Sequence, residues 1–174
     1  MHGALGEGIP LGVARQEPAV RVRMAAVEDM DAMIPLVNAA FAVEDFIEGT
    51  RTDAERMAEM MRKGEFLLAE DPSRRVVACV YAEVRGERAY LGMLAVDPPR
   101  QGTGLGRMMV KAAEDRCRTH GCRWMDLRVL SPRRELLPFY EKLGYLQTRT
   151  EEFHPPRPLR GGIECYGIIL SKTL

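Results

Sequence analysis

Three glycines at alternating positions, Gly102, Gly104 and Gly106, stand directly before the most regular amphipathic pattern in the chain. Glycine adopts turn conformations that other residues avoid, and it lets a ligand approach the main chain closely. The N-terminus of a following helix offers unpaired N–H groups and about half a positive charge. The main chain alone can hold phosphate at such a place, and the sequence therefore predicts a phosphate site at 101–106. The alternative is a glycine-rich connector without a ligand.

Two common phosphate-binding motifs fit this loop poorly. A Walker loop ends in Gly-Lys-Ser/Thr, whereas Arg107 and Met108 follow the last glycine here. The dinucleotide fingerprint G-x-G-x-x-G needs its third glycine one residue later. Its ribose-binding acid should end a strand, but the candidate, Asp126, stands near the start of one. Both a nucleoside triphosphatase and a Rossmann protein are therefore disfavoured.

The elements that must position this loop follow from hydrophobic periodicity. We expect strands at 20–24, 66–70, 75–84, 88–96, 124–130, 145–150 and 164–170. We expect helices at 30–41, 52–64, 105–120 and 131–144. The strand at 75–84 is almost continuously apolar, so helices should cover both faces of a central sheet. The unit formed by 88–96, 105–120 and 124–130 predicts a parallel crossover. The fold class is α/β.

Two of the predicted helices carry start signals. Thr52-x-x-Glu55 is a capping-box pattern. Ser131 and Pro132 have the types of an N-cap and of a first helical residue. Residues 1–19 are rich in glycine and proline without apolar periodicity, and we expect a flexible leader there, followed by a single domain at 20–174.

The composition excludes several partners. The chain has 174 residues with 25 Lys+Arg and 25 Asp+Glu, which argues against a nucleic-acid clamp. No apolar run approaches the roughly 20 residues of a membrane span, and no secretory signal is visible, so we expect a cytoplasmic protein. The four cysteines form no Cys-x-x-Cys pair, and the three histidines are isolated. We therefore expect free thiols and no metal site.

At this point the sequence resembles a known family. Gln101-Gly102-Thr103-Gly104-Leu105-Gly106 fits Q/R-x-x-G-x-G/A, the signature of the GNAT N-acetyltransferase superfamily. The segment 139–145, Phe-Tyr-Glu-Lys-Leu-Gly-Tyr, is similar to a second conserved segment of that family. The resemblance covers about 20–170. It implies a mixed, mostly antiparallel sheet of six or seven strands, about four helices on its two faces, and a splayed parallel strand pair that forms an acetyl-CoA cleft.

The resemblance also implies a site. Met93 and the residues after it would offer backbone groups to the pantetheine arm, and the glycine loop would receive the pyrophosphate of acetyl-CoA, the co-substrate. The expected cofactor-binding residues are Leu94, Ala95, Val96, Gln101, Gly102, Thr103, Gly104, Leu105, Gly106, Arg107 and Tyr140. Tyr140 would be the general acid, because a phenol can donate a hydrogen bond to the thiolate that leaves. The plainer interpretation of Tyr140 is an aromatic on a helix stripe.

The general base is less evident. Many relatives carry a carboxylate on the fourth strand, but 89–96 contains none. Glu83 on the neighbouring strand is our candidate, with Glu44, Asp45, Glu48 or a water chain as alternatives. Arg133 stands where relatives often have Asn, and it could pair with a coenzyme phosphate.

The acceptor should lie between 41–50 and the loop at 151–162. Acidic side chains there could attract a cationic amine or be ordinary surface acids; they are Glu44, Asp45, Glu48, Glu151 and Glu152. A small molecule, an amino acid, a peptide N-terminus and a protein lysine all stay open as acceptors, and a homodimer is compatible with the resemblance. The predicted function is N-acetyl transfer from acetyl-CoA to a primary amine by direct transfer. The alternatives are a non-catalytic acyl-CoA-binding regulatory module and a ping-pong mechanism through a cysteine.

Overall fold

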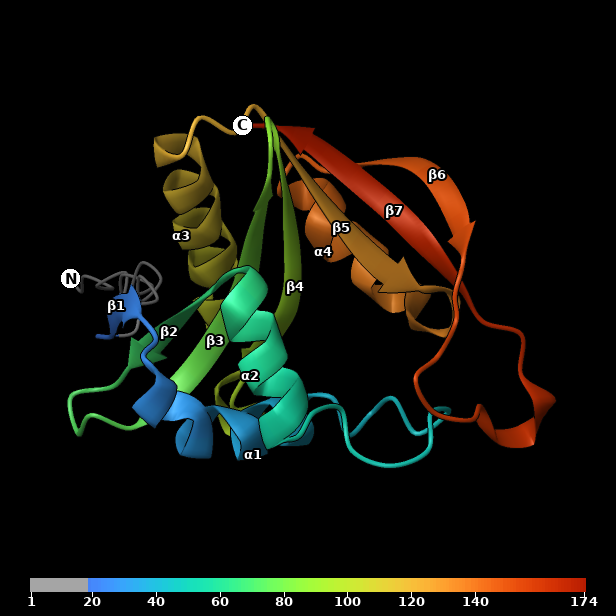
Figure 1. Ribbon diagram of the computed structural model, residues 1–174, viewed down its shortest axis with the longest axis horizontal. Coiled ribbons are helices and arrows are strands. Elements are labelled where there is room, and N and C mark those ends of the chain that lie inside the picture. The colour runs from blue at the N-terminus through green and yellow to red at the C-terminus, as the bar shows by residue number, and fades with distance from the viewer. Residues whose placement is uncertain (1–18) are drawn as a thin grey trace, which may run out of the picture.

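The computed structural model describes residues 19–174, which form one seven-stranded sheet in the order β1-β2-β3-β4-β5-β7-β6. The strands are β1 (Arg21–Met24), β2 (Glu65–Glu70), β3 (Val76–Arg85), β4 (Arg88–Val96), β5 (Trp124–Leu130), β6 (Leu146–Glu152) and β7 (Tyr166–Thr173). The α-helices are α1 (Met30–Ala40), α2 (Ala54–Lys63), α3 (Leu105–Thr119) and α4 (Leu137–Lys142). Figure 1 shows this arrangement, which confirms the expected mixed sheet and its four helices.

All neighbouring strands are antiparallel except β4 and β5, which are parallel as predicted. The pairing of β4 with β5 is short: it runs from Arg88 opposite Trp124 to Leu91 opposite Leu127 and then stops. Beyond that point the two strands diverge (Figure 1). The second half of β4 therefore has no neighbouring strand on its β5 side.

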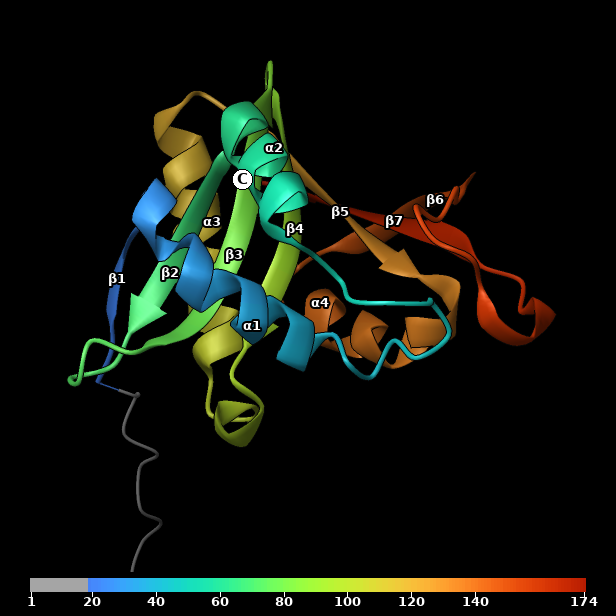
Figure 2. The same ribbon diagram turned by 60° about the horizontal axis from the view of Figure 1, so that its bottom comes forward.

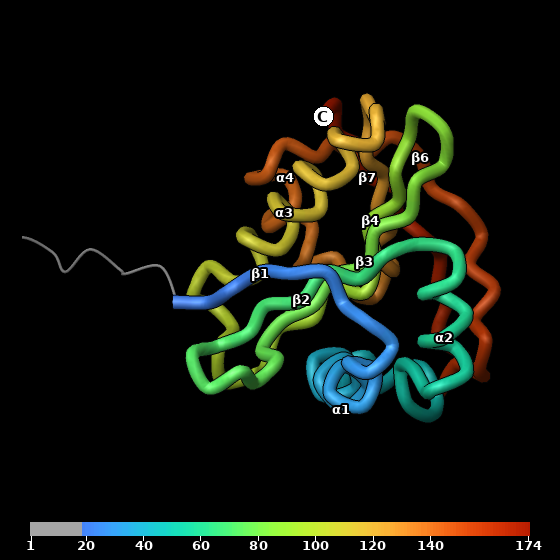
Figure 3. Tube along the Cα trace, turned by 60° about the vertical axis from the view of Figure 1, so that its left-hand side comes forward, coloured from blue at the N-terminus to red at the C-terminus, as the bar shows by residue number. Residues whose placement is uncertain are grey.

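Helices cover both faces of the sheet. In Figure 3, α1 and α2 lie on one side of the sheet, and α3 and α4 lie on the other. The alternation of β2 matches this layering, because Phe66 and Leu68 belong to the core under α1 and α2, whereas Leu67 and Ala69 belong to the core under α3. A strand buried on both faces needs apolar side chains in both directions, which explains the apolar run of β3.

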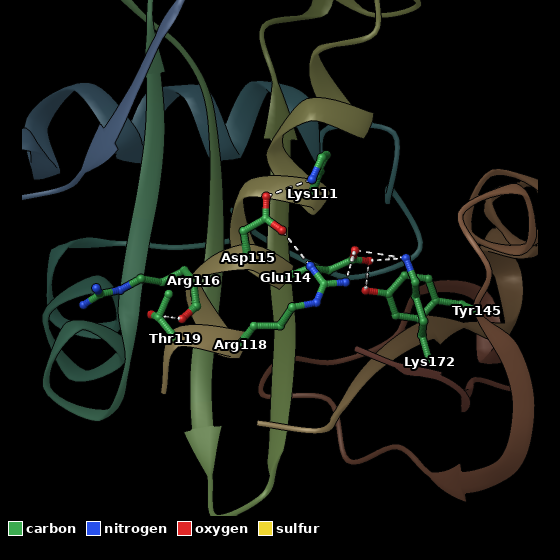
Figure 4. A network of polar contacts seen from close by, with 8 residues as sticks. All are labelled: Lys111, Glu114, Asp115, Arg116, Arg118, Thr119, Tyr145 and Lys172. Carbon is green, nitrogen blue, oxygen red and sulfur yellow. Dashed lines mark hydrogen bonds and ion pairs between the residues drawn. The ribbon is translucent and has the colours of Figure 1, made fainter. Parts of the chain in front are cut away.

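A buried glutamate on α3, Glu114, links this helix to β7, which lies in the half of the sheet beyond the divergence of β4 and β5. Glu114 is only 4% exposed. Its Oε1 accepts a hydrogen bond of 2.9 Å from the hydroxyl of Tyr145, and Nζ of Lys172 on β7 lies 2.9 Å from both carboxylate oxygens. Figure 4 shows the three side chains converging. Because β4 and β5 are joined over only a short stretch, this ion pair is a second connection that holds β7 against α3.

Two predicted helix starts are wrong. The N-cap of α2 is Asp53, whose carboxylate accepts a hydrogen bond of 2.9 Å from the backbone N–H of Arg56. Thr52 is instead buried, and its backbone N–H donates a hydrogen bond of 2.9 Å to Oδ1 of Asn38. Ser131 makes no cap hydrogen bond, because its hydroxyl accepts from the N–H of Tyr166 at 3.1 Å.

The segment after β5 also differs from the single helix expected at 131–144. A 3-10 turn over Ser131–Leu136 comes first, with non-helical backbone at Arg133, and α4 follows with Pro138 in its first turn. The predicted leader, 1–19, lies outside the described residues except for its last residue. Within residues 19–174, no helix is both long and apolar enough to cross a membrane.

Candidate functional site

A cavity of about 490 Å³ opens where β4 leaves β5. One wall is the unpaired part of β4, and the others are β5, the glycine loop, the 3-10 turn with α4 and the segment that follows α1. A bulge shapes the β4 wall: Cys79 pairs with Ala95 and Tyr81 with Gly92, so two residues of β4 lie opposite one of β3. Met93, in the bulge, has φ of +47°. The bulge and the missing neighbour together leave main-chain groups of β4 free to bind a ligand.

The glycine loop lies at the N-terminus of α3 and contributes to the same cavity. Gly102 and Gly104 have φ of +76° and +95°, which favours glycine at both positions. Within the described chain, the N–H groups of residues 102–104 have no recorded hydrogen-bond partner. The N–H of Gln101 differs, since it donates to the carbonyl of Pro98. Arg107 is exposed, and no described carboxylate pairs with it. These donors are placed to receive an anionic group.

Most of the residues expected to bind acetyl-CoA do line this cavity. They are Leu94, Val96, Gln101, Gly102, Gly104, Gly106, Arg107 and Tyr140. Ala95 and Leu105 are instead packed in the two cores, and the hydroxyl of Thr103 donates to the carbonyl of Arg100 at 2.6 Å. If these three residues contribute, they do so through their main chain.

Tyr140 lies on α4 with its ring held between two aromatic neighbours. Ring centroids are 5.0 Å apart for Phe139 and 6.0 Å apart for Tyr145. The side chain is 8% exposed and borders the cavity, and its hydroxyl has no hydrogen-bond partner recorded in residues 19–174. Burial raises the pKa of Tyr140 above its usual value, so the hydroxyl keeps its proton at neutral pH. It can donate a hydrogen bond into the cavity.

Glu83 lies on β3, in a second cavity on the α2 side of β4. Its carboxylate accepts hydrogen bonds from the Tyr81 hydroxyl at 3.0 Å and from Nε of Arg85 at 2.8 Å. The hydrogen bond from Arg85 lowers the pKa of Glu83, although partial burial opposes the shift. Glu83 is therefore ionised at neutral pH, but the same bond makes it a weak base. Its assignment as the general base stays a prediction.

The second cavity has a volume of about 350 Å³ and is continuous in its lining with the first. Both cavities are bordered by Phe41, Glu44, Arg51, Tyr90, Gly92, Met93, Arg128 and Phe153. The two segments expected around the acceptor, 41–50 and 151–162, both contribute to its walls. Figure 2 shows the cyan segment after α1 passing close to the loop that follows β6, and the two form an isolated bridge between Ile47 and Leu159.

Two of the five acids expected in this region, Glu44 and Glu151, are paired with arginines, whereas Asp45 and Glu48 are exposed and have no ion pair recorded in residues 19–174. Glu44 is 8% exposed on its side chain and lies between two guanidinium groups, 3.2 Å from Nη1 of Arg51 and 3.0 Å from Nη1 of Arg133. Glu151 pairs with Arg128 at 3.2 Å. Arg133 is thus engaged by Glu44 and also by Glu135. It borders the cavity with its charge already compensated.

The cysteines are poorly suited to carry an acyl group. Burial raises the pKa of Cys79 to about 12 and that of Cys117 to about 11. Burial also raises the pKa of Cys122 and of Cys165. Because the thiolate is the nucleophile, a raised pKa lowers reactivity at neutral pH. None of the four borders either cavity.

The sequence placed Phe41 and Phe153 in the two segments expected around the acceptor, but it did not single out Arg51 or Arg128 as cavity residues. Arg51 lies in the irregular segment between α1 and α2, and Arg128 lies on β5 between the buried Leu127 and Val129. The charge of Arg128 between two buried apolar residues was the only signal that could have pointed to one of them. Their common position depends on contacts between distant parts of the chain.

Comparison with known proteins agrees with this geometry. The model of the acetyltransferase (GNAT) family matches residues 30–145, and the chain belongs to that family. A mycothiol acetyltransferase of Propionibacterium freudenreichii subsp. shermanii is 28% identical over 143 residues, which are 76% of this chain and 45% of that protein. The chain thus spans about half the length of this relative.

Solved structures share the fold at low identity. The ribosomal-protein-S18-alanine N-acetyltransferase of Escherichia coli superposes with a TM-score of 0.71 at 19% identity, over 88% of this chain and 93% of that one. A candidate acetyltransferase of Salmonella typhimurium, yncA, was solved with its cofactor acetyl-CoA. It gives a TM-score of 0.71 at 20% identity, over 90% of this chain and 94% of that one. At these identities the likeness establishes the fold.

Proposed function

We propose that the protein transfers the acetyl group of acetyl-CoA to the nitrogen of a primary amine by direct transfer. One observation carries the proposal: the part of β4 beyond its pairing with β5, the N–H groups of Gly102 and Gly104, and the hydroxyl of Tyr140 border one cavity, and among residues 19–174 none of these N–H groups or this hydroxyl has a recorded partner. The main-chain donors suit a pyrophosphate and an amide-containing arm, and Arg107 adds a positive charge. The residues present therefore fit acetyl-CoA, which would supply an activated acetyl thioester.

Residues of the protein would then assist the transfer at the sulfur, at the acetyl oxygen and at the amine. Transfer forms a C–N bond and breaks the C–S bond, so negative charge develops on sulfur. The Tyr140 hydroxyl would donate a hydrogen bond to that sulfur, and main-chain N–H groups of β4 beyond its pairing with β5 would stabilise the charge on the acetyl oxygen. The amine must lose a proton before attack, and we assign its removal to Glu83, through water where contact is indirect.

Release of free coenzyme A thiol over a broad panel of amines tests this function. We expect thiol release that depends on one class of amine, with an N-acetylated product identified by mass spectrometry. Binding of acetyl-CoA without turnover of any amine would overturn the proposal and favour a non-catalytic acyl-CoA-binding module.

A further inference from the structure

The second cavity, beside the proposed acetyl-CoA cleft, is lined by more positive than negative charge. Its cationic side chains are Arg51, Arg56, Lys63, Arg128 and Arg157, and its acids are Glu44, Glu59 and Glu83. Each of the three acids already has a cationic partner: Glu44 binds two arginines, Glu59 binds Lys63, and Glu83 binds Arg85. An amine that carried only positive charge would meet an excess of like charge here.

Arg51 shares its one recorded acidic partner, Glu44, with Arg133. Its side chain is 30% exposed, and its guanidinium carbon lies 4.6 Å from the centroid of the Phe41 ring. Nη1 faces Glu44, Nε has only the thioether sulfur of Met93 at 3.5 Å, and no partner for Nη2 is recorded among residues 19–174. Burial is the main cause that lowers its pKa, and repulsion from Arg128 and Arg56 adds to it.

Arg128 is placed at the same cavity by a glycine on the neighbouring strand. A Cβ on residue 167 would lie 2.6 Å from Cδ of Arg128, so the side chain can occupy its present position only beside glycine. The guanidinium lies 5.2 Å from the centroid of the Phe153 ring. Its one acidic partner, Glu151, is more than one-third exposed at 3.2 Å, and such ion pairs are weak.

We propose that the acceptor carries an oxyanion, such as a carboxylate or a phosphonate, beside its amine, and that Arg51 and Arg128 bind this group. The inference rests on the function proposed above and names its substrate class. Guanidinium groups bind such oxyanions with paired hydrogen bonds, and the bound anion would relieve the repulsion between the arginines. The aromatic walls and a volume of about 350 Å³ suit a small molecule of the amino-acid type. Polycationic amines are disfavoured.

Acceptors that share one skeleton and differ in the oxyanion test the proposal. For phenylalanine, leucine and methionine we would compare the amino acid, its amide, the decarboxylated amine and the aminophosphonate. We expect kcat/KM for a carboxylate or phosphonate member to exceed that of its amide by about 10- to 150-fold, the range for hydrogen bonds to charged groups. Equal values for acid and amide, or a preference for the decarboxylated amine, would overturn the inference while leaving acetyl transfer intact.

Substitutions test which residues cause the preference for the acid over its amide. Arg128→Gln, and Gly167→Ala, which displaces Arg128, should reduce the preference for the acid over its amide. Arg149→Gln is the matched control, because Arg149 also faces Glu151, at 4.0 Å, but borders neither cavity and is 56% exposed. It should leave the preference unchanged. A full preference in Arg128→Gln and Arg51→Gln alike would contradict the assignment.

A binding measurement separates the two proposals if no amine in the panel is acetylated. In the presence of coenzyme A, calorimetry would compare each N-acetyl amino acid with its N-acetyl amino amide. We expect tighter binding of the acid in the wild-type protein and not in Arg51→Gln. Equal affinity for the acid and the amide would overturn the oxyanion site independently of turnover.

Discussion

Nη1 of Arg133 donates a hydrogen bond of 3.0 Å to Oε1 of Glu44, across 89 positions of sequence. The bond joins the segment after α1 to the 3-10 turn before α4, and these are two walls of the larger cavity. The other oxygen of Glu44 faces Arg51, which borders both cavities. The carboxylate of Glu44 therefore fixes the position of the proposed coenzyme cleft relative to the proposed acceptor cavity.

Glu44→Gln should lower stability and weaken the binding of both substrates. The substitution removes the charge that compensates two guanidinium groups, and we expect a cost of about 1–2 kcal/mol in the free energy of unfolding. Urea denaturation measures it. Glu135→Gln is the control, because Glu135 also pairs with Arg133 but is 61% exposed. Equal effects of the two variants would contradict the bridging role of Glu44.

Gly104→Ala should weaken acetyl-CoA binding by about tenfold or more, because a Cβ would enter the space in which the pyrophosphate is expected. Gly121→Ala is a matched control at the other end of α3. Both glycines have positive φ, +95° and +80°, with no protein atom within 4 Å of an added Cβ. Both variants should lose about 1 kcal/mol of stability from backbone strain. If calorimetry shows the same loss of acetyl-CoA affinity in both, the loop is not the binding site.

Two tyrosines should separate catalysis from stability. Tyr140→Phe should lower kcat by about 100-fold or more with unchanged acetyl-CoA affinity, because it removes the donor to the leaving sulfur. Tyr145→Phe should keep kcat but lose about 1–2 kcal/mol of stability, because the Tyr145 hydroxyl serves the buried Glu114. Steady-state kinetics and thermal unfolding check the pair. An unchanged kcat in Tyr140→Phe would remove Tyr140 from the mechanism.

The pH dependence of the ratio of wild-type kcat to Tyr140→Phe kcat follows from the direction in which the pKa of Tyr140 is shifted. Burial raises the pKa of Tyr140, so the hydroxyl is protonated below its ordinary pKa of about 10 and remains so somewhat above it. The ratio of wild-type to variant kcat should therefore stay constant from neutral pH to about pH 10. A ratio that falls toward one as the pH rises from 7 to about 9 would show that Tyr140 ionises in that range and contradict this prediction.

Glu83→Gln should lower kcat in the accessible pH range while leaving acetyl-CoA affinity unchanged. Arg85 lowers the pKa of Glu83, so the wild-type carboxylate is ionised above about pH 4.5, and it loses its charge only as the pH falls through a value below that. Glu87→Gln is the control, because Glu87 lies at the turn of the same hairpin and is exposed. If raising the pH, which deprotonates the amine in solution, does not restore activity to Glu83→Gln, the loss has another cause than proton removal.

The sequence was most informative where the chemistry is local. The glycine loop is a short motif, so the cavity wall at Gly102 and Gly104 could be predicted from residue types and spacing, and the place of Tyr140 followed from the family resemblance. The positions of the strands along the chain followed for the same reason, because each strand carries its own periodicity. These features need little information from distant residues.

Features that depend on contacts between distant residues could not be predicted from the sequence. Ser131 is of a residue type that often caps a helix, but its hydroxyl accepts a hydrogen bond from the backbone N–H of Tyr166 on β7. Glu44 has the type of a surface acid, but Arg51 and Arg133 enclose it. The charge of the second cavity is set by such long-range partners, and for that reason the sequence suggested acids for the acceptor where the structure gathers arginines.

The fate of an isotopically labelled acetyl group tests the central claim most directly. The protein would be mixed with labelled acetyl-CoA, first alone and then with an amine of the carboxylate-bearing panel, and intact mass spectrometry would follow the label on protein and amine. We predict no label on the protein in the first step and label on the amine nitrogen in the second. Label on a cysteine, or label that stays on coenzyme A with every amine, would contradict direct acetyl transfer.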